Sequence, residues 1–261
     1  MAKKSKKKEN ENETVETVVT ETAEQTEQTE QIEEKSLIDT DMLIEVLKGR
    51  SDFYLALSGF YFKPLTQAQI DAMAGTDYMA FSADEPLLVE GFNDITRYLR
   101  KRNTGTRQML AVDFTSSFGA TQTYEGYTAM PYASLYLGKE GLLSQKPRAE
   151  VFRVFKRNCL RITDTSTPDD HLSFLLEFLA VMSDRAAEAL SEGRISEACE
   201  SLEESRDFIN KLILSWYDRF MDIALKLIEV RFYRGVLKVT KGYLLMDLET
   251  IDDMLEEMNQ K

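Results

Sequence analysis

The sequence predicts an all-α protein, a single bundle of about nine to ten helices that follows a disordered N-terminal tail. Gly (12) and Pro (5) are scarce among the 261 residues, whereas short strands joined by tight turns would need many of both. From Asp39 onward apolar residues recur at steps of three and four, and no window alternates convincingly with a period of two. The hydrophobic content of 43% is enough for a sizeable core.

Residues 1–36 are the predicted disordered, charged tail, and 37–261 are the predicted helical domain. The first 35 residues hold six lysines and ten glutamates, a net charge of −4, which leaves −9 for the rest of the chain. The near-repeat EQTEQTEQ has no apolar period, so it cannot bury enough surface to offset the entropy that ordering would cost.

The first half of the domain gives several separate helix signals. Met42, Leu43, Val46 and Leu47 form one apolar stripe, which predicts the first helix. The following signals are a capping box, Thr66 to Gln69, that opens a short helix to Met73, then helices over 85–102 and 106–118, a loop over 119–132, and a helix from Pro147 through Phe152 and Phe155 to Cys159.

The strongest periodicity runs from Ile195 to about Leu245. One helix face is predicted to hold Ile209, Leu212, Ile213, Trp216, Tyr217, Phe220, Ala224, Leu227 and Ile228. We interpret the aromatic stripe of Trp216, Tyr217 and Phe220 as core.

The segment that begins Thr167-Pro-Asp-Asp-His predicts a well-marked helix start. We expect Thr167 to cap the helix, Pro168 to take the first helical position, and Asp169 and Asp170 to complement the positive end of the helix dipole. The helix that follows is apolar on two faces, so it should lie in the middle of the bundle. These faces are Leu172, Leu175, Leu176 and Leu179 on one side and Phe174, Phe178 and Val181 on the other.

Two interpretations of this segment are open. It is either a well-capped core helix, or its start grips an incoming chain, because His171 is the only histidine and stands beside two carboxylates. The segment Met130-Pro-Tyr-Ala-Ser-Leu-Tyr136 has the same two interpretations. It either packs two aromatic rings onto the bundle or forms a groove wall, since tyrosine offers an apolar face and a hydroxyl group.

A single histidine excludes several enzyme classes. A di-iron bundle needs a Glu-x-x-His pair on each of two helices, and a histidine–aspartate phosphohydrolase needs several histidines. The chain has no GxSxG elbow, no GxxxxGK[ST] loop and no GxGxxG after a strand. Cys159 and Cys199 have no CxxC spacing. We therefore predict a binding protein with no catalytic centre, no cofactor and no metal site.

Charge and hydropathy indicate the cellular compartment of the protein and the charge of its partners. The basic start MAKKSKKK is followed by an acidic, Thr-rich stretch instead of an apolar one, unlike a signal peptide. No run reaches the roughly 18 apolar residues that cross a bilayer. We expect a cytoplasmic protein, with no stable membrane insertion. Its net charge of −13 repels nucleic acid and favours basic partners.

These motifs occur in the order typical of a known family. Asp113-Phe114 precedes the loop, Pro131-Tyr-Ala-Ser134-x-Tyr136 follows it, and then come Pro168-Asp-Asp170-His171-Leu and Phe208-Ile-x(6)-Trp216. Over roughly residues 40–248 the chain resembles the TorD/DmsD/NarJ-like redox-enzyme maturation chaperones. Pro-x-Asp-His-Leu is the most specific element, whereas Leu212 stands where the family often has histidine.

The resemblance implies a cytoplasmic, TorD-like chaperone that binds the twin-arginine signal peptide, or an equivalent N-terminal segment, of a molybdopterin oxidoreductase. Binding would last through cofactor insertion and precede export. The implied contacts are Pro168, Asp170 and His171. The neighbouring residues Asp169, Pro131, Tyr132, Ser134 and Tyr136 complete the predicted binding site as its acidic rim and groove wall.

Two other functions compete with this one. A helical adaptor would bind a folded partner through an exposed face, with the Asp–His element purely structural. A nucleotide-handling enzyme is suggested by some relatives, but the chain has no phosphate loop. A monomer and a domain-swapped dimer both fit a long-looped bundle.

Overall fold

The computed structural model describes residues 39–78, 84–137, 145–164 and 166–259, and these fold as an all-α bundle. Within these residues there are ten α-helices, one π-helical segment and no β-strand, which confirms the predicted fold class. The predicted disordered tail lies outside the described residues. The elements are α2 Thr40–Phe62, α3 Gln67–Gly75, α4 Pro86–Leu99, α5 Thr106–Phe118, α6 Ala133–Leu137, α7 Gln145–Arg157, α8 Leu172–Ser191, α9 Ile195–Phe208, η2 Ile209–Leu214, α10 Ser215–Leu227 and α11 Arg231–Asn259.

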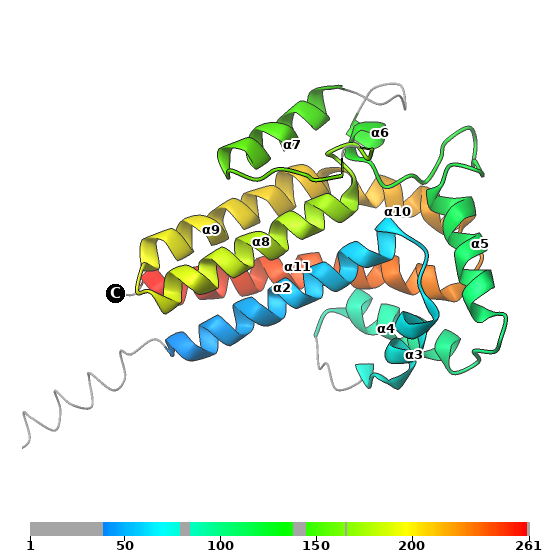
Figure 1. Ribbon diagram of the computed structural model, residues 1–261, viewed down its shortest axis with the longest axis horizontal. Helices are drawn as coiled ribbons and strands as arrows, with labels where there is room; N and C mark the ends of the chain where they lie inside the picture. Colours follow the sequence, from blue (N-terminus) through cyan, green and yellow to red (C-terminus); the bar gives the residue numbers. More distant parts are fainter. Residues whose placement is uncertain (1–38, 79–83, 138–144, 165, 260–261) are drawn as a thin grey trace, which may run out of the picture.

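Helix α8 lies at the centre of the bundle, between α2 and α9 (Figure 1). Both of its predicted apolar faces pack inward: Leu175 and Leu179 are fully buried on one side, and Phe174 and Phe178 are buried on the other. A helix that is apolar all round can lie only where neighbours cover it on every side. The expectation of a central helix is confirmed.

Helix α2 packs along α8 with a period typical of one helix face. Leu43 and Leu47 are buried as predicted, and the stripe continues through Tyr54 and Leu57. The prediction was wrong for Met42, whose side chain is 62% exposed. The buried face of α2 therefore begins one residue later, at Leu43.

A buried ion pair joins α2 to α8 and to α11, which has 29 residues. The Arg50 Nε donates to Asp247 Oδ1 at 2.6 Å, and the Arg50 Nη1 donates to the Ser183 hydroxyl at 2.6 Å. The Tyr54 hydroxyl donates to the other Asp247 oxygen at 2.5 Å. Both charged side chains are 2% exposed. The other terminal nitrogen, Arg50 Nη2, has no hydrogen-bond partner within the described residues, and the remaining bonds connect the three helices at one level of the bundle.

Helices α4 and α11 approach each other closely through glycine. A Cβ on Gly91 would lie 2.7 Å from the Gly235 carbonyl oxygen, and one on Gly242 would lie 2.5 Å from the Leu88 backbone nitrogen. Only residues without a side chain permit this approach.

No described helix combines the length and the apolarity that a bilayer span requires.

The remaining sequence signals mostly correspond to observed elements. Thr66 and Gln69 form the predicted capping box of α3. The nine apolar residues predicted on one face from Ile209 to Ile228 are all buried, although their helix includes the unpredicted π-helical segment η2. There the Trp216 indole nitrogen donates to the Leu212 carbonyl at 2.6 Å.

Helix α7 differs slightly from its prediction. It includes Pro147 but ends at Arg157, because Cys159 has a positive φ of 55°, which no α-helix accommodates.

Candidate functional site

The predicted start of the central helix is wrong by several residues. Helix α8 begins at Leu172, and its N-cap is His171, whose Nδ1 accepts a hydrogen bond from the Ser173 backbone N–H at 3.2 Å. Pro168 therefore lies before the helix, and the Thr167 hydroxyl donates to Asp164 instead of capping. The Thr-Pro-Asp-Asp composition favours a helix start. Pairing with another segment overrides that preference.

The partner segment is the Pro-Tyr-Ala-Ser stretch predicted as a groove wall. Tyr132 and His171 form an isolated antiparallel bridge. The Leu172 N–H donates to the Pro131 carbonyl at 2.8 Å, and the Ala133 N–H donates to the Asp170 carbonyl at 3.2 Å. The structure thus brings together the two motifs that the sequence placed about 35 residues apart. We call residues 130–134 and 168–172 together the Asp–His corner.

Asp170 is the N-terminal cap of α6, not of α8. Its side chain is fully buried, and its Oδ2 accepts from the Ser134 N–H at 2.8 Å. The other oxygen, Oδ1, has no hydrogen-bond partner within the described residues, and neither has the buried Ser134 hydroxyl. Unsatisfied polar atoms are costly to bury. Packing alone therefore does not explain why Asp170 and Ser134 occupy these buried positions.

His171 is enclosed by aromatic rings. Its centroid lies 4.8 Å from that of Tyr132, 6.1 Å from Phe62 and 6.0 Å from Phe174. Burial in this apolar site lowers the pKa of His171 to about 4, so the ring is neutral at physiological pH. A neutral ring suits the observed geometry, because Nδ1 must carry a lone pair to cap α8.

The other predicted site residues differ in accessibility. The Asp169 carboxylate is 27% exposed and faces Arg148 at 3.5 Å. Tyr132 and Pro168 are partly exposed, whereas Pro131 is buried. Of the two carboxylates predicted to form an acidic rim, only Asp169 therefore reaches solvent.

Tyr136 is a packing residue in this structure. Its ring is 6% exposed and stacks on Trp216, with centroids 5.4 Å apart and planes 11° from parallel. Its hydroxyl contacts the Thr128 and Met130 carbonyl oxygens at 3.1 and 3.0 Å, which closes the predicted loop onto α10. The packing interpretation therefore holds for Tyr136, whereas Tyr132 packs against His171 and neither tyrosine lines the groove that adjoins the corner.

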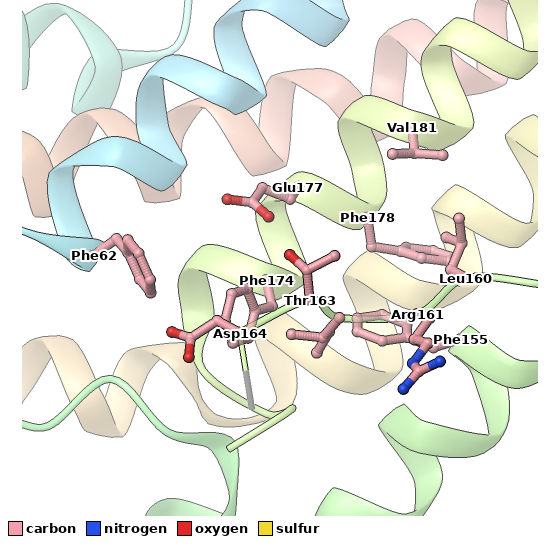
Figure 2. A pocket seen from close by; sticks show the side chains of 11 residues that line it. Phe62, Phe155, Leu160, Arg161, Thr163, Asp164, Phe174, Glu177, Phe178 and Val181 are labelled. Atoms are coloured by element: carbon pink, nitrogen blue, oxygen red, sulfur yellow. The ribbon is translucent and has the colours of Figure 1, made fainter. Parts of the chain in front are cut away.

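A groove of about 280 Å³ adjoins the corner, and we call it the α8 groove (Figure 2). It reaches the corner through Phe62 and Phe174, the two phenylalanines that contact His171. Its walls come from the end of α2, from α7, from the segment that follows α7 and from α8. The lining residues are Phe62, Phe155, Leu160, Arg161, Ile162, Thr163, Asp164, Phe174, Glu177, Phe178 and Val181.

Two carboxylates border this largely apolar surface. Glu177 Oε1 accepts from the Ser58 hydroxyl at 3.0 Å. Hydrogen bonds from the Ser166 hydroxyl and backbone N–H and from the Thr167 hydroxyl, together with the charge of Lys63, lower the pKa of Asp164. Asp164 is therefore ionised at neutral pH. Arg161 is the cation among the lining residues, and its side chain is exposed.

Sequence reasoning found the floor of the groove but not its walls. Phe174, Phe178 and Val181 were recognised as the second apolar face of α8, whereas Phe62 and Leu160 to Asp164 were not connected with it. The usable signal was that second face, since a helix that is apolar on both sides needs two partners. The part of the chain that the structure describes holds no cluster of three or more His, Cys, Asp or Glu side chains suited to a metal ion.

Comparison with known proteins gives a consistent result. The family model for the nitrate reductase delta subunit matches residues 85–222. The chain is 30% identical over 205 residues to the chaperone protein TorD of Vibrio vulnificus strain YJ016, which covers 76% of this chain and 92% of that protein. It is 28% identical to the chaperone protein TorD of Aliivibrio fischeri over 77% of this chain and 93% of that one. The predicted absence of enzymatic activity agrees with these relatives, which are chaperones.

Proposed function

The chain belongs to the family of the nitrate reductase delta subunit and the TorD chaperones, and on this premise we propose that it is a cytoplasmic maturation chaperone for a molybdopterin oxidoreductase. It binds the client's twin-arginine signal peptide, or an equivalent N-terminal segment, through cofactor insertion and before export. The single observation that supports this best is the apolar, acid-bordered α8 groove beside the Asp–His corner.

The chemistry of such a leader complements the groove. A twin-arginine leader joins two permanent cations to an apolar stretch. Seven of the lining residues are hydrophobic, and Asp164 and Glu177 supply negative charge at the border. With about 280 Å³, the groove is near the lower end of ligand sites, which hold about 300–1,000 Å³. It therefore accommodates a few apolar side chains, not a whole helix.

Typical free energies indicate how much charge pairs and apolar contacts each contribute to leader affinity. Micromolar binding needs about 8 kcal/mol, whereas each exposed charge pair contributes only about 0.2–1 kcal/mol. Apolar burial, at about 25 cal/mol per Å², must therefore supply most of the affinity. The carboxylates and the net charge of −13 set the orientation and the rate of encounter.

The predicted contact residues have two roles in this proposal. Asp169, Pro168 and Tyr132 do not line the groove, but they are partly exposed, so in this proposal the leader extends from the groove over the corner to reach them. Asp170 and His171 are buried and cap the starts of α6 and α8, and the α8 cap places Phe174 in the first turn beside the groove. Pro131, Ser134 and Tyr136 support the same arrangement from behind.

Calorimetry with a leader peptide tests the proposal. The twin-arginine leader of a molybdopterin oxidoreductase from the same organism should bind the full-length protein with a micromolar Kd. Val181→Lys places a cation in the groove and should weaken binding at least tenfold. Val112→Lys is the matched control, because Val112 is 62% exposed on α5 and does not line the groove. No heat from the wild-type protein, or equal loss in both variants, would count against the groove.

The burial of Asp170 and His171 also favours a second candidate, a helical adaptor in which this pair is purely structural. The two functions respond differently to Asp170→Asn combined with His171→Ala. Because both residues cap helices, the melting temperature should fall under either function; if the leader also depends on the corner, the affinity of the remaining folded protein for the leader weakens as well. If the pair serves stability alone, the melting temperature falls and the affinity of the remaining folded protein for the leader is unchanged.

A further inference from the structure

A cluster of cations stands apart on this acidic molecule. Residues 97–107 contain five Lys or Arg and no Asp or Glu, in a chain with 45 acidic and 32 basic residues. At the end of α4, Arg97, Arg100 and Lys101 meet Arg231 of α11 around a cavity of about 470 Å³, with Tyr98 as its remaining lining residue. We call Arg97, Arg100, Lys101 and Arg231 the basic face.

The basic face is largely unneutralised. Within the described part of the chain, Arg97, Arg100 and Lys101 form no ion pair. Arg231 lies 3.6 Å from Asp94, but Asp94 is also bound by Lys238 at 2.7 Å, so one carboxylate is shared between two cations. The face therefore keeps a net positive charge and attracts an anionic partner.

Helix dipoles explain only part of the cluster. Cations near the C-terminus of α4 complement its negative end, which accounts for Arg97. Arg231 is the first residue of α11, where the positive end of the dipole disfavours a cation. The helix dipole therefore does not explain Arg231, whose pairing within the described residues is the shared contact with Asp94.

We propose that the basic face is a docking site for the acidic N-terminal segment of the same chain, residues 9–25. This segment holds six glutamates and no lysine or arginine. Its charge is opposite to that of the face, and its attachment to the same molecule raises its effective concentration to the range that weak, multiple charge pairs require.

The segment is long enough to reach the face. Helix α11 runs antiparallel to α2, because Tyr54 meets Asp247 and Tyr61 meets Thr240. With a rise of 1.5 Å per residue, Asp39 and Arg231 are then about 45 Å apart along the bundle. Figure 1 agrees, since α2 begins at one end and α4 lies toward the other. At no more than about 3.3 Å per residue, about 14 or more residues are needed to cover this distance, so residues 9–25 can reach the face and the residues between them and Asp39 serve as the connection.

Paramagnetic broadening in the full-length chain tests this docking. A nitroxide on Thr20→Cys, with Cys159→Ser and Cys199→Ser, should broaden the backbone signals of residues 97–102 and 231. The effect should be strong at about 0.01 M salt, where charges act over about 30 Å, and lost at about 1 M, where they act over about 3 Å. The variant Arg97→Gln/Arg100→Gln/Lys101→Gln should abolish it.

Matched controls make the result decisive. Lys48→Gln/Arg153→Gln/Lys156→Gln removes the same charge from three exposed residues elsewhere and should leave the broadening intact. Broadening that this control abolishes equally, or that falls on the α8 groove instead, would overturn the proposal. So would broadening of an isotope-labelled, nitroxide-free chain mixed with the nitroxide-bearing one, because the segment would then bind a second copy.

Discussion

The interface between α4 and α11 and the α8 groove show two ways in which helices meet in this molecule. At the first, Gly91, Gly235 and Gly242 let backbones approach until no Cβ fits between them. At the second, aromatic rings hold the helices apart: Phe155 of α7 stacks on Phe178 of α8 with centroids 5.4 Å apart. Glycine closes one contact completely, whereas at the other the stacked rings line an open groove.

The difference indicates which residues carry stability and which are free for binding. The closed part of the bundle, formed by α2, α4, α8 and α11, contains the fully buried ion pair and the glycine contacts. The wall that α7 gives to the groove is held by few buried side chains, among them Val151 and Phe155, with partly exposed ion pairs such as Arg157 with Glu204 around them. Substitutions in the closed part should therefore change folding, and those in the groove should change binding.

The largest effect is expected from Arg50→Met. Removal of the cation leaves Asp247 buried without its ionic partner, which should lower the free energy of unfolding by about 3–5 kcal/mol. Urea denaturation measures this loss. The double variant Arg50→Met/Asp247→Leu removes both charges and should regain most of it. An equally unstable double variant would mean that Arg50 acts through packing and not through its charge.

The Asp–His corner lies between the closed part of the bundle and the groove. The pH dependence of the free energy of unfolding should show how much His171 contributes to stability. The unfolded chain takes up the His171 proton near its ordinary pKa of 6.5, whereas the folded chain does so only near pH 4. Between these values the unfolded state binds more protons, so stability is full above pH 6.5 and falls by up to about 3 kcal/mol as the pH approaches 4.

The variant His171→Asn isolates this effect, because asparagine can also cap a helix but does not titrate. The stability difference between the wild-type chain and this variant, from urea denaturation at several pH values, should change over the same range. Since His171 is the only histidine, a constant difference would show that its ring is solvated in the folded chain.

A smaller effect is expected from Gly91→Ala. Its Cβ would meet three atoms of α11 at 2.7 Å, two of them backbone, so the helices must separate, at a cost of about 1–3 kcal/mol in thermal or chemical unfolding. Gly49→Ala is the matched control, because Gly49 lies in α2 with nothing within 4 Å of the added atom. That control should stabilise the chain by about 0.5–1 kcal/mol. Equal effects at both positions would remove the contrast between closed and open contacts.

The smallest effect on folding is expected from Glu177→Gln in the groove. The change keeps an acceptor for Ser58, so the free energy of unfolding should shift by less than about 0.5 kcal/mol. Loss of one charge pair of about 0.2–1 kcal/mol predicts leader binding that is weaker by about 1.5- to 5-fold in calorimetry. Glu188→Gln, an exposed position farther along α8, should change neither quantity.

Local periodicity predicted the helices well, because each needs only its own apolar stripe. Helix α5 has the bounds that the sequence indicated, and Thr66 and Gln69 cap α3 as expected. The start of α8 was misplaced because its true cap depends on pairing with residues 131–133, which no local pattern reveals. Capping preferences are weak compared with such tertiary contacts.

The candidate site was only partly predictable for the same reason. The sequence indicated that the Asp–His element and the Pro-Tyr-Ala-Ser stretch act together, and the structure joins them. It did not indicate that Asp170 caps a helix 36 residues earlier in the chain, or that Phe62 contacts His171. Those contacts depend on how α2 and α6 are placed around α8.

Asp170 and His171 are neighbours in the chain, yet they secure the first turns of two different helices. A hinge at this dipeptide would swing α6 and α8 together, since neither helix can reorient alone without losing its cap. Tyr136 of α6 stacks on Trp216 of α10, so a displacement of α6 would also act on α10. Phe174, in the first turn of α8, contacts His171 and lines the groove, so the groove and the starts of both helices meet at this ring.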